Sequence, residues 1–180
     1  LGVGNLARRH GFDRIIRGLA RWPEVAIEFW IIGSGSEYKN LVELAKSHGL
    51  HGRQVKFFPP LFGEELDQLV CQAVAGVGNL GFHRIGVDWS SALKELEYLG
   101  RGLPVIASRN SEIAVRMSEY VYRCDANDSD VNLPEVFRFL SENEFVFDKV
   151  RTVTAIRFDW TDVSSAMIDR IAQIRTEKLY

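Results

Sequence analysis

Two spacings of apolar residues alternate along the chain. Short apolar runs, typical of buried strands, are separated by segments in which apolar residues recur every three or four positions, which is typical of amphipathic helices. Residues 25–32 (VAIEFWII) form the clearest run, and a helical pattern over residues 37–48 follows it and ends at Gly49. The pattern predicts strands over residues 1–4, 25–32, 55–58, 75–80, 103–107 and 120–123, and helices that begin near residue 12 or cover residues 37–48, 64–73, 93–99, 134–140 and 161–178.

This alternation of strands and helices predicts the fold class. It implies βαβ units and a parallel sheet with helices on both faces, which we expect to be an α/β, Rossmann-like, doubly wound domain of five or six strands. A length of 180 residues fits one such domain. In these sheets ligands bind beyond the carboxyl ends of the strands. We therefore expect a site in the loops that follow strands, which are residues 4–11, 33–37, 78–91 and 107–111.

The composition is that of an ordinary soluble globular protein, with 46% hydrophobic and 26% charged residues. A net charge of −2 provides no general basic field, so we expect no nucleic-acid partner. Cys71 and Cys124 form no CxxC pair, and we interpret both as buried free thiols in a reducing compartment. No apolar run approaches the roughly 20 residues of a membrane span, and no signal-peptide pattern is present. The expected localisation is therefore cytoplasmic.

Two of the loops have features of phosphate sites. Residues 5–11 (NLARRHG) place Arg8, Arg9 and His10 just before a helix, where cations oppose the helix dipole unless an anion lies between them. This indicates phosphate, although solvated surface arginines explain the same residues equally well. Residues 33–36 (GSGS) are a fragment of a phosphate-binding glycine motif, but a tight strand-to-helix turn is the simpler explanation.

The loop over residues 78–91 (GNLGFHRIGVDWSS) is long for a connection between a strand and a helix, and such loops are often functional. Arg84 can bind a phosphate with its forked guanidinium group. His83 can do the same, although a lone histidine is more often a packed or surface residue. Trp89 either stacks on a sugar or a base or anchors the loop, and the sequence leaves both open.

Residues 90–108 (SSALKELEYLGRGLPVIAS) carry the most specific pattern. Ser90 or Ser91 is expected to cap a helix whose free amides form an anion site. Apolar residues cover much of this helix, so we expect it to be well buried. Glu97 lies in its second turn and needs a partner there, such as the vicinal hydroxyls of a ribose. A salt bridge to Arg101 at i+4, or a solvent-facing Glu97, remains an alternative.

Together these segments resemble the C-terminal domain of the group 1 (family 4) retaining glycosyltransferases of GT-B fold. The resemblance implies the donor-binding half of an enzyme that transfers a sugar from a nucleotide-diphosphate sugar to a glycan or lipid-linked acceptor in bacterial polysaccharide biosynthesis. It implies neither a metal nor a cofactor, and it places the acceptor site on an N-terminal domain that this sequence lacks. Because the chain opens inside a strand, we interpret residues 1–180 as a single domain cut from a longer protein. The matching segments are residues 3–16 (VGNLARRHGFDRII), 29–37 (FWIIGSGSE), 55–58, 63–69 (GEELDQL), 77–86 (VGNLGFHRIG) and 91–108.

The resemblance assigns roles to particular residues. Glu97 matches the second glutamate of the family's E-x7-E motif, which grips the donor ribose. The turn that leads to the helix start at Ser91 matches the amides that meet the diphosphate, and the cationic first loop matches the side chains that hold it. The nucleobase is expected between Phe58 and Leu61. The candidate donor-binding residues are therefore Arg8, Arg9, His10, Phe58, Leu61, His83, Arg84, Gly86, Ser91, Ala92, Lys94 and Glu97.

The sequence departs from the family pattern at three positions. Trp89 stands where the first glutamate of the motif is expected, which puts the contacts to the donor sugar in doubt. The adjacent Asp88 is an alternative carboxylate for this role. His10 replaces the lysine of the first loop, and Asn5 replaces its arginine. The lost charge must come from another cation, and the candidates are Arg8, Arg9, Arg84 and Lys94.

These departures support an alternative function, which is a catalytically inactive GT-B-like domain for nucleotide binding or scaffolding. The helix expected near the C-terminus, within residues 161–180, either packs toward the missing domain or on its own sheet. We expect the isolated chain to bind a nucleoside diphosphate weakly without turnover, and the full-length protein to associate peripherally with the membrane.

Overall fold

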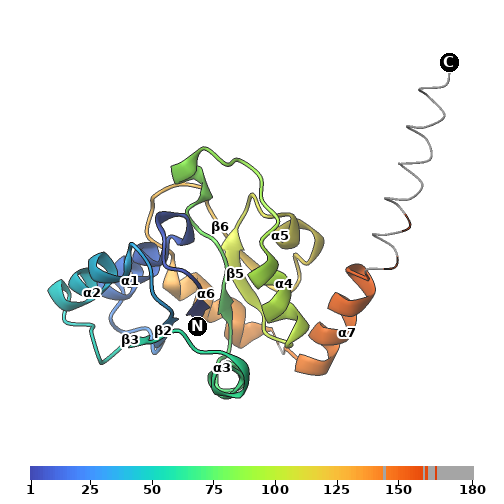
Figure 1. Ribbon diagram of the computed structural model, residues 1–180, viewed down its shortest axis with the longest axis horizontal. Helices are drawn as coiled ribbons and strands as arrows, with labels where there is room; N and C mark the ends of the chain where they lie inside the picture. The colour runs from blue at the N-terminus through green and yellow to red at the C-terminus, as the bar shows by residue number, and fades with distance from the viewer. Residues whose placement is uncertain (144, 160, 162–164, 166–180) are drawn as a thin grey trace.

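The described residues of the computed structural model, 1–143, 145–159, 161 and 165, form two three-stranded parallel sheets (Figure 1). The sheets meet at Leu1, whose carbonyl accepts a hydrogen bond from the Val77 amide at 2.7 Å and whose amine donates one to the Ala75 carbonyl at 2.7 Å. The combined strand order is therefore β3-β2-β1-β4-β5-β6, and the direction of winding reverses between β1 and β4. The parallel, doubly wound sheet expected from the sequence is confirmed. The strands are β1 (Gly2–Val3), β2 (Phe29–Ile32), β3 (Val55–Phe58), β4 (Gly76–Val77), β5 (Val105–Ser108) and β6 (Val121–Cys124).

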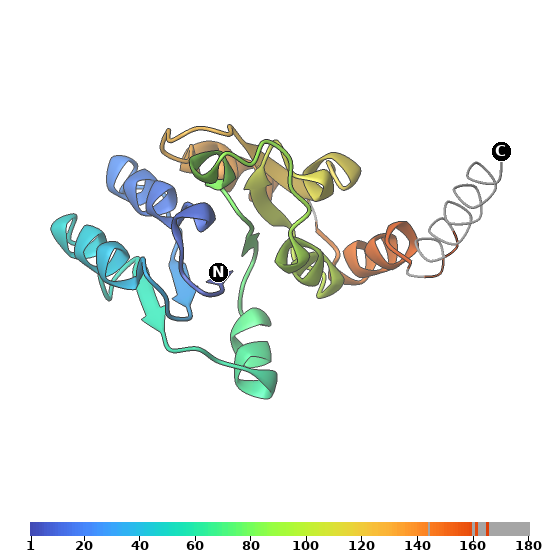
Figure 2. The same ribbon diagram turned by 45° about the horizontal axis from the view of Figure 1, so that its top comes forward.

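Helices cover both faces of this sheet (Figure 2). One core cluster joins strand residues to α1 (Phe12–Arg21), α2 (Tyr38–Ser47) and α6 (Leu133–Glu142). The second cluster joins them to α3 (Gly63–Val70), α4 (Leu93–Gly100), α5 (Glu112–Arg116) and α7 (Phe147–Arg157). Strands enclosed in this way are apolar on both sides, which explains why the sequence shows continuous apolar runs rather than strict alternation.

Two strands, β2 and β4, are each four residues shorter than expected. Residues 25–28 lie before β2, because the amides of Val25 and Ile27 bond locally to the carbonyls of Trp22 and Val25 instead of to a neighbouring strand. β4 ends after two residues, because the next amides turn away from the ladder: Asn79 donates to the Glu95 carboxylate and Leu80 donates to a backbone carbonyl of the first loop. Local hydrogen bonds therefore delay the start of β2 and end β4 early.

Helix α7 was not expected from the sequence. Its buried side chains are Val150 and Thr154, so one of the two inward positions is polar and the apolar spacing is weak. The Thr154 hydroxyl is satisfied within the helix by the Val150 carbonyl at 2.7 Å. The helix expected over residues 161–178 lies almost wholly outside the described residues. None of the described helices is both long enough and apolar enough to cross a membrane.

Candidate functional site

Two of the loops predicted from the sequence lie in contact at the carboxyl edge of the sheet. They are the loop after β1, which contains the short 3-10 helix η1 (Arg8–His10), and the loop after β4, which contains η2 (Phe82–Ile85). The amides of Leu80 and Gly81 donate to the carbonyls of His10 and Arg9, each at 3.0 Å. Gly11 lies between them with a φ of 64°, and a Cβ there would collide with Leu80. The loops therefore meet at the point where the strand order reverses, which is where ligands bind in such sheets.

His10 is buried and uncharged. Its ring stacks on Phe12 at a centroid distance of 5.4 Å, and its Nδ1 accepts a hydrogen bond from the Ala7 amide at 3.1 Å. Burial, with the charges of Lys94 and Arg9, lowers the pKa of His10 to about 3. Because Nδ1 is the acceptor, the proton of the neutral ring is on Nε2, and this histidine can offer an anion a hydrogen bond but no charge.

The side chain of Lys94 extends from α4 to the surroundings of His10 and Phe12. Its Nζ atom is buried, lies 5.0 Å from the centroid of the Phe12 ring, and has no hydrogen-bond partner among the described residues. Burial lowers the pKa of Lys94 to about 7, against a raising effect of Glu95 and with a further lowering effect of Arg9. Arg8 and Arg9 form no ion pair within the described part of the chain, and Arg8 is exposed.

Arg84 lies beside this cluster but is already held by two carboxylates. It donates to both oxygens of Asp13 at 2.7 and 2.8 Å and to Asp128 at 2.5 Å, and its side chain is only 11% exposed. The hydrogen bond to Asp13 is the main reason that the pKa of Arg84 lies above its ordinary value. His83 contacts Asp128 at 3.2 Å. The predicted binding of phosphate by Arg84 would require these pairs to open, so the structure gives it a bracing position between η2 and α1.

Replacing Arg84 by methionine is expected to lower the free energy of unfolding by about 2 kcal/mol, because Asp13 loses two charged hydrogen bonds in a half-buried setting. Burial favours a raised pKa for Asp13, but the bonds from Arg84 and Arg17 outweigh it and hold the pKa below its ordinary value. The contribution is therefore present near neutral pH and is lost as the pH falls through that lowered pKa. Urea denaturation near pH 7 and near pH 3 measures both effects.

The control is Arg109→Met, which removes the exposed pair of Arg109 and Asp125 at 3.0 Å. It should change the free energy of unfolding by less than about 1 kcal/mol. Equal losses in the two variants would contradict the bracing role of Arg84.

The amino end of α4 carries no side-chain cap. Ala92 occupies the N-cap position, so the expectation that Ser90 or Ser91 caps this helix is wrong. Ser90 is instead tied by its backbone to the loop after β5, donating to Asn110 at 3.1 Å and accepting from Glu112 at 2.8 Å. The first amides of α4 consequently lack a side-chain acceptor and are available to an anion. Ser91 is exposed beside them, and Gly86 is exposed at the other end of this loop.

The buried carboxylate of α4 is Glu95, which sequence reasoning missed. It is fully buried, accepts from the Asn79 amide at 3.0 Å, and accepts from the Ser111 hydroxyl at 2.5 Å. Glu97 is exposed, so the expectation of a well-buried position is wrong, and the solvent-facing alternative agrees with the structure. Arg101 pairs with Asp67 instead of with Glu97. Glu95 and Glu97 are two positions apart on α4, so their side chains are about 200° apart around the helix axis, and only one of them can face the sheet. Gly78 leaves the space that the Glu95 carboxylate occupies, since a Cβ at Gly78 would overlap that carboxylate.

The exposed Glu97 lies on α4, one turn before Arg101. Arg101, one turn further along α4, donates to Asp67 of α3 at 2.8 Å, which places this row of α4 beside α3. The Glu97 carboxylate makes no hydrogen bond or ion pair with the rest of the described chain.

A cavity of about 420 Å³ lies beside the segment between β3 and α3. It is lined by the backbone-rich turns after β1 and β2, with Leu61 and Phe62 on the third side. Phe62 is 79% exposed, whereas Phe58 is half-buried at the end of β3. Pro60 and Leu61, in the segment predicted to contact the nucleobase, therefore line a cavity at the same edge of the sheet as η1 and the amino end of α4.

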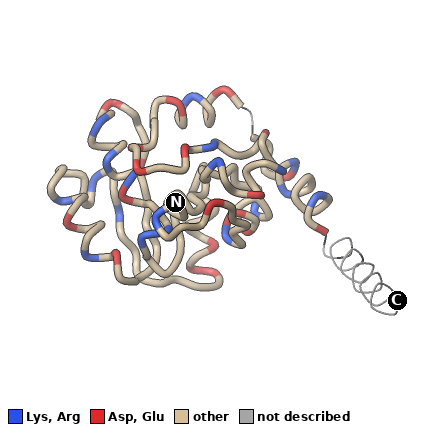
Figure 3. Tube along the Cα trace, turned by 90° about the horizontal axis from the view of Figure 1, so that it is seen from above, with Lys and Arg blue, Asp and Glu red and all other residues tan. Residues whose placement is uncertain are grey.

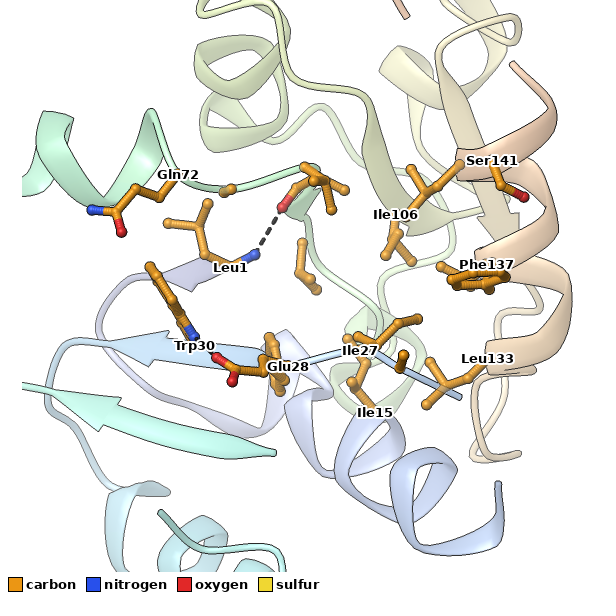
Figure 4. A pocket seen from close by; sticks show the side chains of 18 residues that line it. Leu1, Ile15, Ile27, Glu28, Trp30, Gln72, Ile106, Leu133, Phe137 and Ser141 are labelled. Atoms are coloured by element: carbon orange, nitrogen blue, oxygen red, sulfur yellow. Dashed lines mark hydrogen bonds between the residues drawn. The ribbon is translucent and has the colours of Figure 1, made fainter. Parts of the chain in front are cut away.

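A second cavity, of about 440 Å³, lies at the amino ends of the strands (Figure 4). Figure 4 shows Ile27, Leu133 and Phe137 around it, together with the hydrogen bond from Leu1 to Ala75. None of the twelve predicted donor-binding residues lines it. It lies at the edge of the sheet away from the loops described above.

Charged residues of both signs are spread over the described part of the chain, with lysine and arginine interspersed with aspartate and glutamate along the trace (Figure 3). Within the described part of the chain, no group of three or more His, Cys, Asp or Glu is placed to hold a metal ion. Cys124 is buried, which raises the pKa of its thiol to about 12. Cys71 is exposed just after the end of α3, so the expectation that both thiols are buried is wrong for Cys71.

The sequence matches no protein-family model and no curated protein. The structure is similar to sucrose-phosphate synthase from Thermosynechococcus elongatus, with 18% identity and a TM-score of 0.71 over 98% of this chain and 46% of that one. It is similar to the pneumococcal O-GlcNAc transferase solved with UDP and GlcNAc, with 15% identity and a TM-score of 0.60 over 99% of this chain and 35% of that one.

A third similar structure is the C-terminal domain of a group 1 glycosyl transferase from Francisella tularensis, with 15% identity and a TM-score of 0.62 over 86% of this chain and 83% of that domain. The chain spans about half the length of the first of these, 46%, and most of the isolated C-terminal domain. It therefore has the fold of one half of a GT-B glycosyltransferase.

Proposed function

We propose that this chain is the donor-binding half of a glycosyltransferase and holds a nucleotide-diphosphate sugar at the carboxyl edge of its sheet. The observation that carries the proposal is that three features of this chain match the three parts of such a donor. The cavity beside Leu61 fits a base, the unpaired carboxylate of Glu97 fits ribose hydroxyls, and the free amides of α4 with Lys94 and Arg9 fit a diphosphate. The pneumococcal relative of the same fold was solved with UDP, which supports this reading.

In this proposal the domain acts by electrostatic stabilisation. Helix amides and cations fixed around the diphosphate favour the negative charge that grows on it as the sugar departs. The acceptor, a glycan or a lipid-linked saccharide, binds to another part of the full-length protein. The 180-residue chain should therefore bind nucleoside diphosphates without transferring sugar. We place the full-length protein in the cytoplasm, in peripheral contact with the membrane that carries lipid-linked acceptors.

The proposal is tested by titrating the isotope-labelled chain with UDP, GDP and ADP and following its backbone amide resonances. One of the three should shift amides of residues 3–6, 61–62 and 86–93 together, because base, ribose and phosphates contact all three segments. The absence of any shift with all three nucleotides would refute donor binding.

Glu97→Gln is expected to weaken binding of the preferred nucleoside diphosphate about 10- to 100-fold, since it replaces charge-assisted hydrogen bonds to the ribose, which are worth about 1.5–3 kcal/mol. The matching ligand change is the 2′,3′-dideoxy nucleotide, which should weaken binding to the wild type by a similar factor. The two losses should not add, because both remove the same contact. Glu43→Gln, an exposed change on α2, serves as the control and should leave the affinity unchanged.

Trp89 favours one alternative, a non-catalytic relative that binds nucleotide alone. Its side chain is 58% exposed, at the position where a glutamate is expected to contact the donor sugar. A donor-binding domain should bind one nucleotide sugar more tightly than the nucleoside diphosphate alone, whereas a non-catalytic relative should show no such preference. Calorimetry with a panel of nucleotide sugars distinguishes the two.

A further inference from the structure

The junction of η1 and α4 brings cationic groups together without a paired acid. The charged or titratable groups that face Lys94 are Arg9 and His10 from η1 and Glu95 from its own helix. Glu95 forms no ion pair with Lys94, because its two oxygens are engaged by the loops after β4 and β5. Phe12 of α1 contributes only a ring face, 5.0 Å from the Lys94 Nζ.

This arrangement is unfavourable while the site is empty. A buried ammonium group without an acceptor loses its hydration, and the attraction of Glu95 and of the Phe12 ring offsets only part of that loss. A second positive charge, on Arg9, disfavours it further. The amine can avoid this penalty by releasing its proton, which is why the pKa of Lys94 falls to about 7. His10 offers no competing proton acceptor near neutral pH, since its pKa is about 3.

An anion bound at this junction would stabilise the charged form of the Lys94 amine relative to the neutral form. The first amides of α4 have no side-chain acceptor, and Lys94 is only one residue beyond the first residue of that helix. An anion that accepts from these amides therefore lies within reach of the flexible lysine stem. We infer that Lys94 is the cation that meets the diphosphate of the donor, in place of a residue of the first loop, and that it takes up a proton when the diphosphate binds. This inference rests on the proposed function.

The step involves protonation alone. The proton comes from the solvent and forms an N–H bond on Nζ, while no other bond forms or breaks. Because the bound anion stabilises only the charged amine, affinity must increase as the pH falls from about 9 toward about 7, by up to tenfold per pH unit. The donor's own phosphates are fully ionised in this range and contribute no proton change.

Calorimetry of the wild-type chain tests the uptake directly. The preferred nucleoside diphosphate is titrated at about pH 8 in buffers with different enthalpies of ionisation. Inorganic pyrophosphate keeps a titratable proton of its own at this pH, so it is titrated only to test binding. At that pH about nine-tenths of the Lys94 amines are neutral in the empty site, given a pKa of about 7. The dependence of the observed enthalpy on the buffer should therefore correspond to nearly one proton taken up per ligand bound.

Lys94→Met should abolish the uptake and weaken nucleotide binding about 10- to 100-fold at pH 7. The control Lys39→Met removes an exposed lysine of α2 and should change neither quantity. A measurement without any variant is the ¹³Cε resonance of Lys94, which should titrate near pH 7 in the free chain and above about pH 9 with nucleotide bound.

The outcomes separate the two proposals. Nucleotide binding without proton uptake, or with the Lys94 resonance unmoved, would overturn the role of Lys94 and leave donor binding standing. No binding of any nucleotide or of pyrophosphate would refute donor binding itself, and this inference with it.

Discussion

Gly33→Ala is expected to lower the free energy of unfolding by about 4 kcal/mol, the sum of about 2 for backbone strain and about 2 for overpacking. Gly33 has a φ of 132°, which is unfavourable for a residue with a side chain, and a Cβ there would overlap the carbonyl of Gly4. The backbone cannot move aside freely, because the Gly33 amide donates to Phe58 at 3.1 Å and the Leu6 amide donates to Ser34 at 2.7 Å. Urea denaturation followed by circular dichroism measures the loss.

The control for this prediction is Gly49→Ala. Gly49 has a φ of 67°, and a Cβ there has no neighbour within 4 Å, so only the backbone preference opposes the change. Its expected loss is about 1 kcal/mol. If both variants lose the same amount, the close approach of the loops after β1 and β2 contributes nothing. The large loss at Gly33 would also support the interpretation of residues 33–36 as a tight turn.

Glu95→Ala has the second largest expected effect, a loss of about 3 kcal/mol in the free energy of unfolding. Alanine leaves the Asn79 amide and the Ser111 hydroxyl without an acceptor in a buried site, and each unsatisfied group costs about 1–3 kcal/mol. Glu95→Gln is the matched variant, since it keeps the shape and one acceptor oxygen, and it should lose less than about 1 kcal/mol near neutral pH.

The pH dependence of the two Glu95 variants provides a second measurement. Burial raises the pKa of Glu95, although the bonds from Ser111 and Asn79 oppose the shift. A carboxyl whose pKa is raised on folding contributes stability at low pH that is lost as the pH rises through the folded-state pKa. The wild type should therefore lose stability relative to Glu95→Gln over that rise. An alanine variant as stable as the glutamine variant would show that the Asn79 and Ser111 bonds do not hold α4 in place.

Much of the fold follows from local pattern. The predicted strand over Val55–Phe58 agrees with β3 at both ends, and the helix expected over residues 37–48 agrees closely with α2, Tyr38–Ser47. The pattern failed where an inward position is polar, as at Thr154 of α7, and where loop bonds end a strand early, as at Asn79. In both cases a hydrogen bond, rather than apolar burial, determines the local structure. The spacing of apolar residues gives no indication of such a bond.

The sequence predicts the location of the candidate site better than it predicts the residues that form the site. Loops after strands of a parallel sheet must meet at its carboxyl edge, so the four loops could be chosen from the alternation alone. The choice among four candidate cations could not be made in this way. Arg84 and Lys94 are both cations in the sequence. In the structure Arg84 is paired with Asp13 and Asp128, which lie 71 and 44 residues away along the chain, whereas the Lys94 Nζ is buried without a hydrogen-bond partner among the described residues.

The sequence by itself determined the order of the strands, the parallel sheet and the edge at which we propose that a ligand binds, because hydrophobic periodicity and turn chemistry are local properties. Only the tertiary structure decided which of two nearby glutamates is buried, because that depends on a glycine, Gly78, from another loop lying against α4. It also decided that Lys94, rather than Arg84, remains unpaired at the junction of η1 and α4. Ion pairing and burial depend on distances between segments far apart in the chain, and these exist only once the sheet has formed.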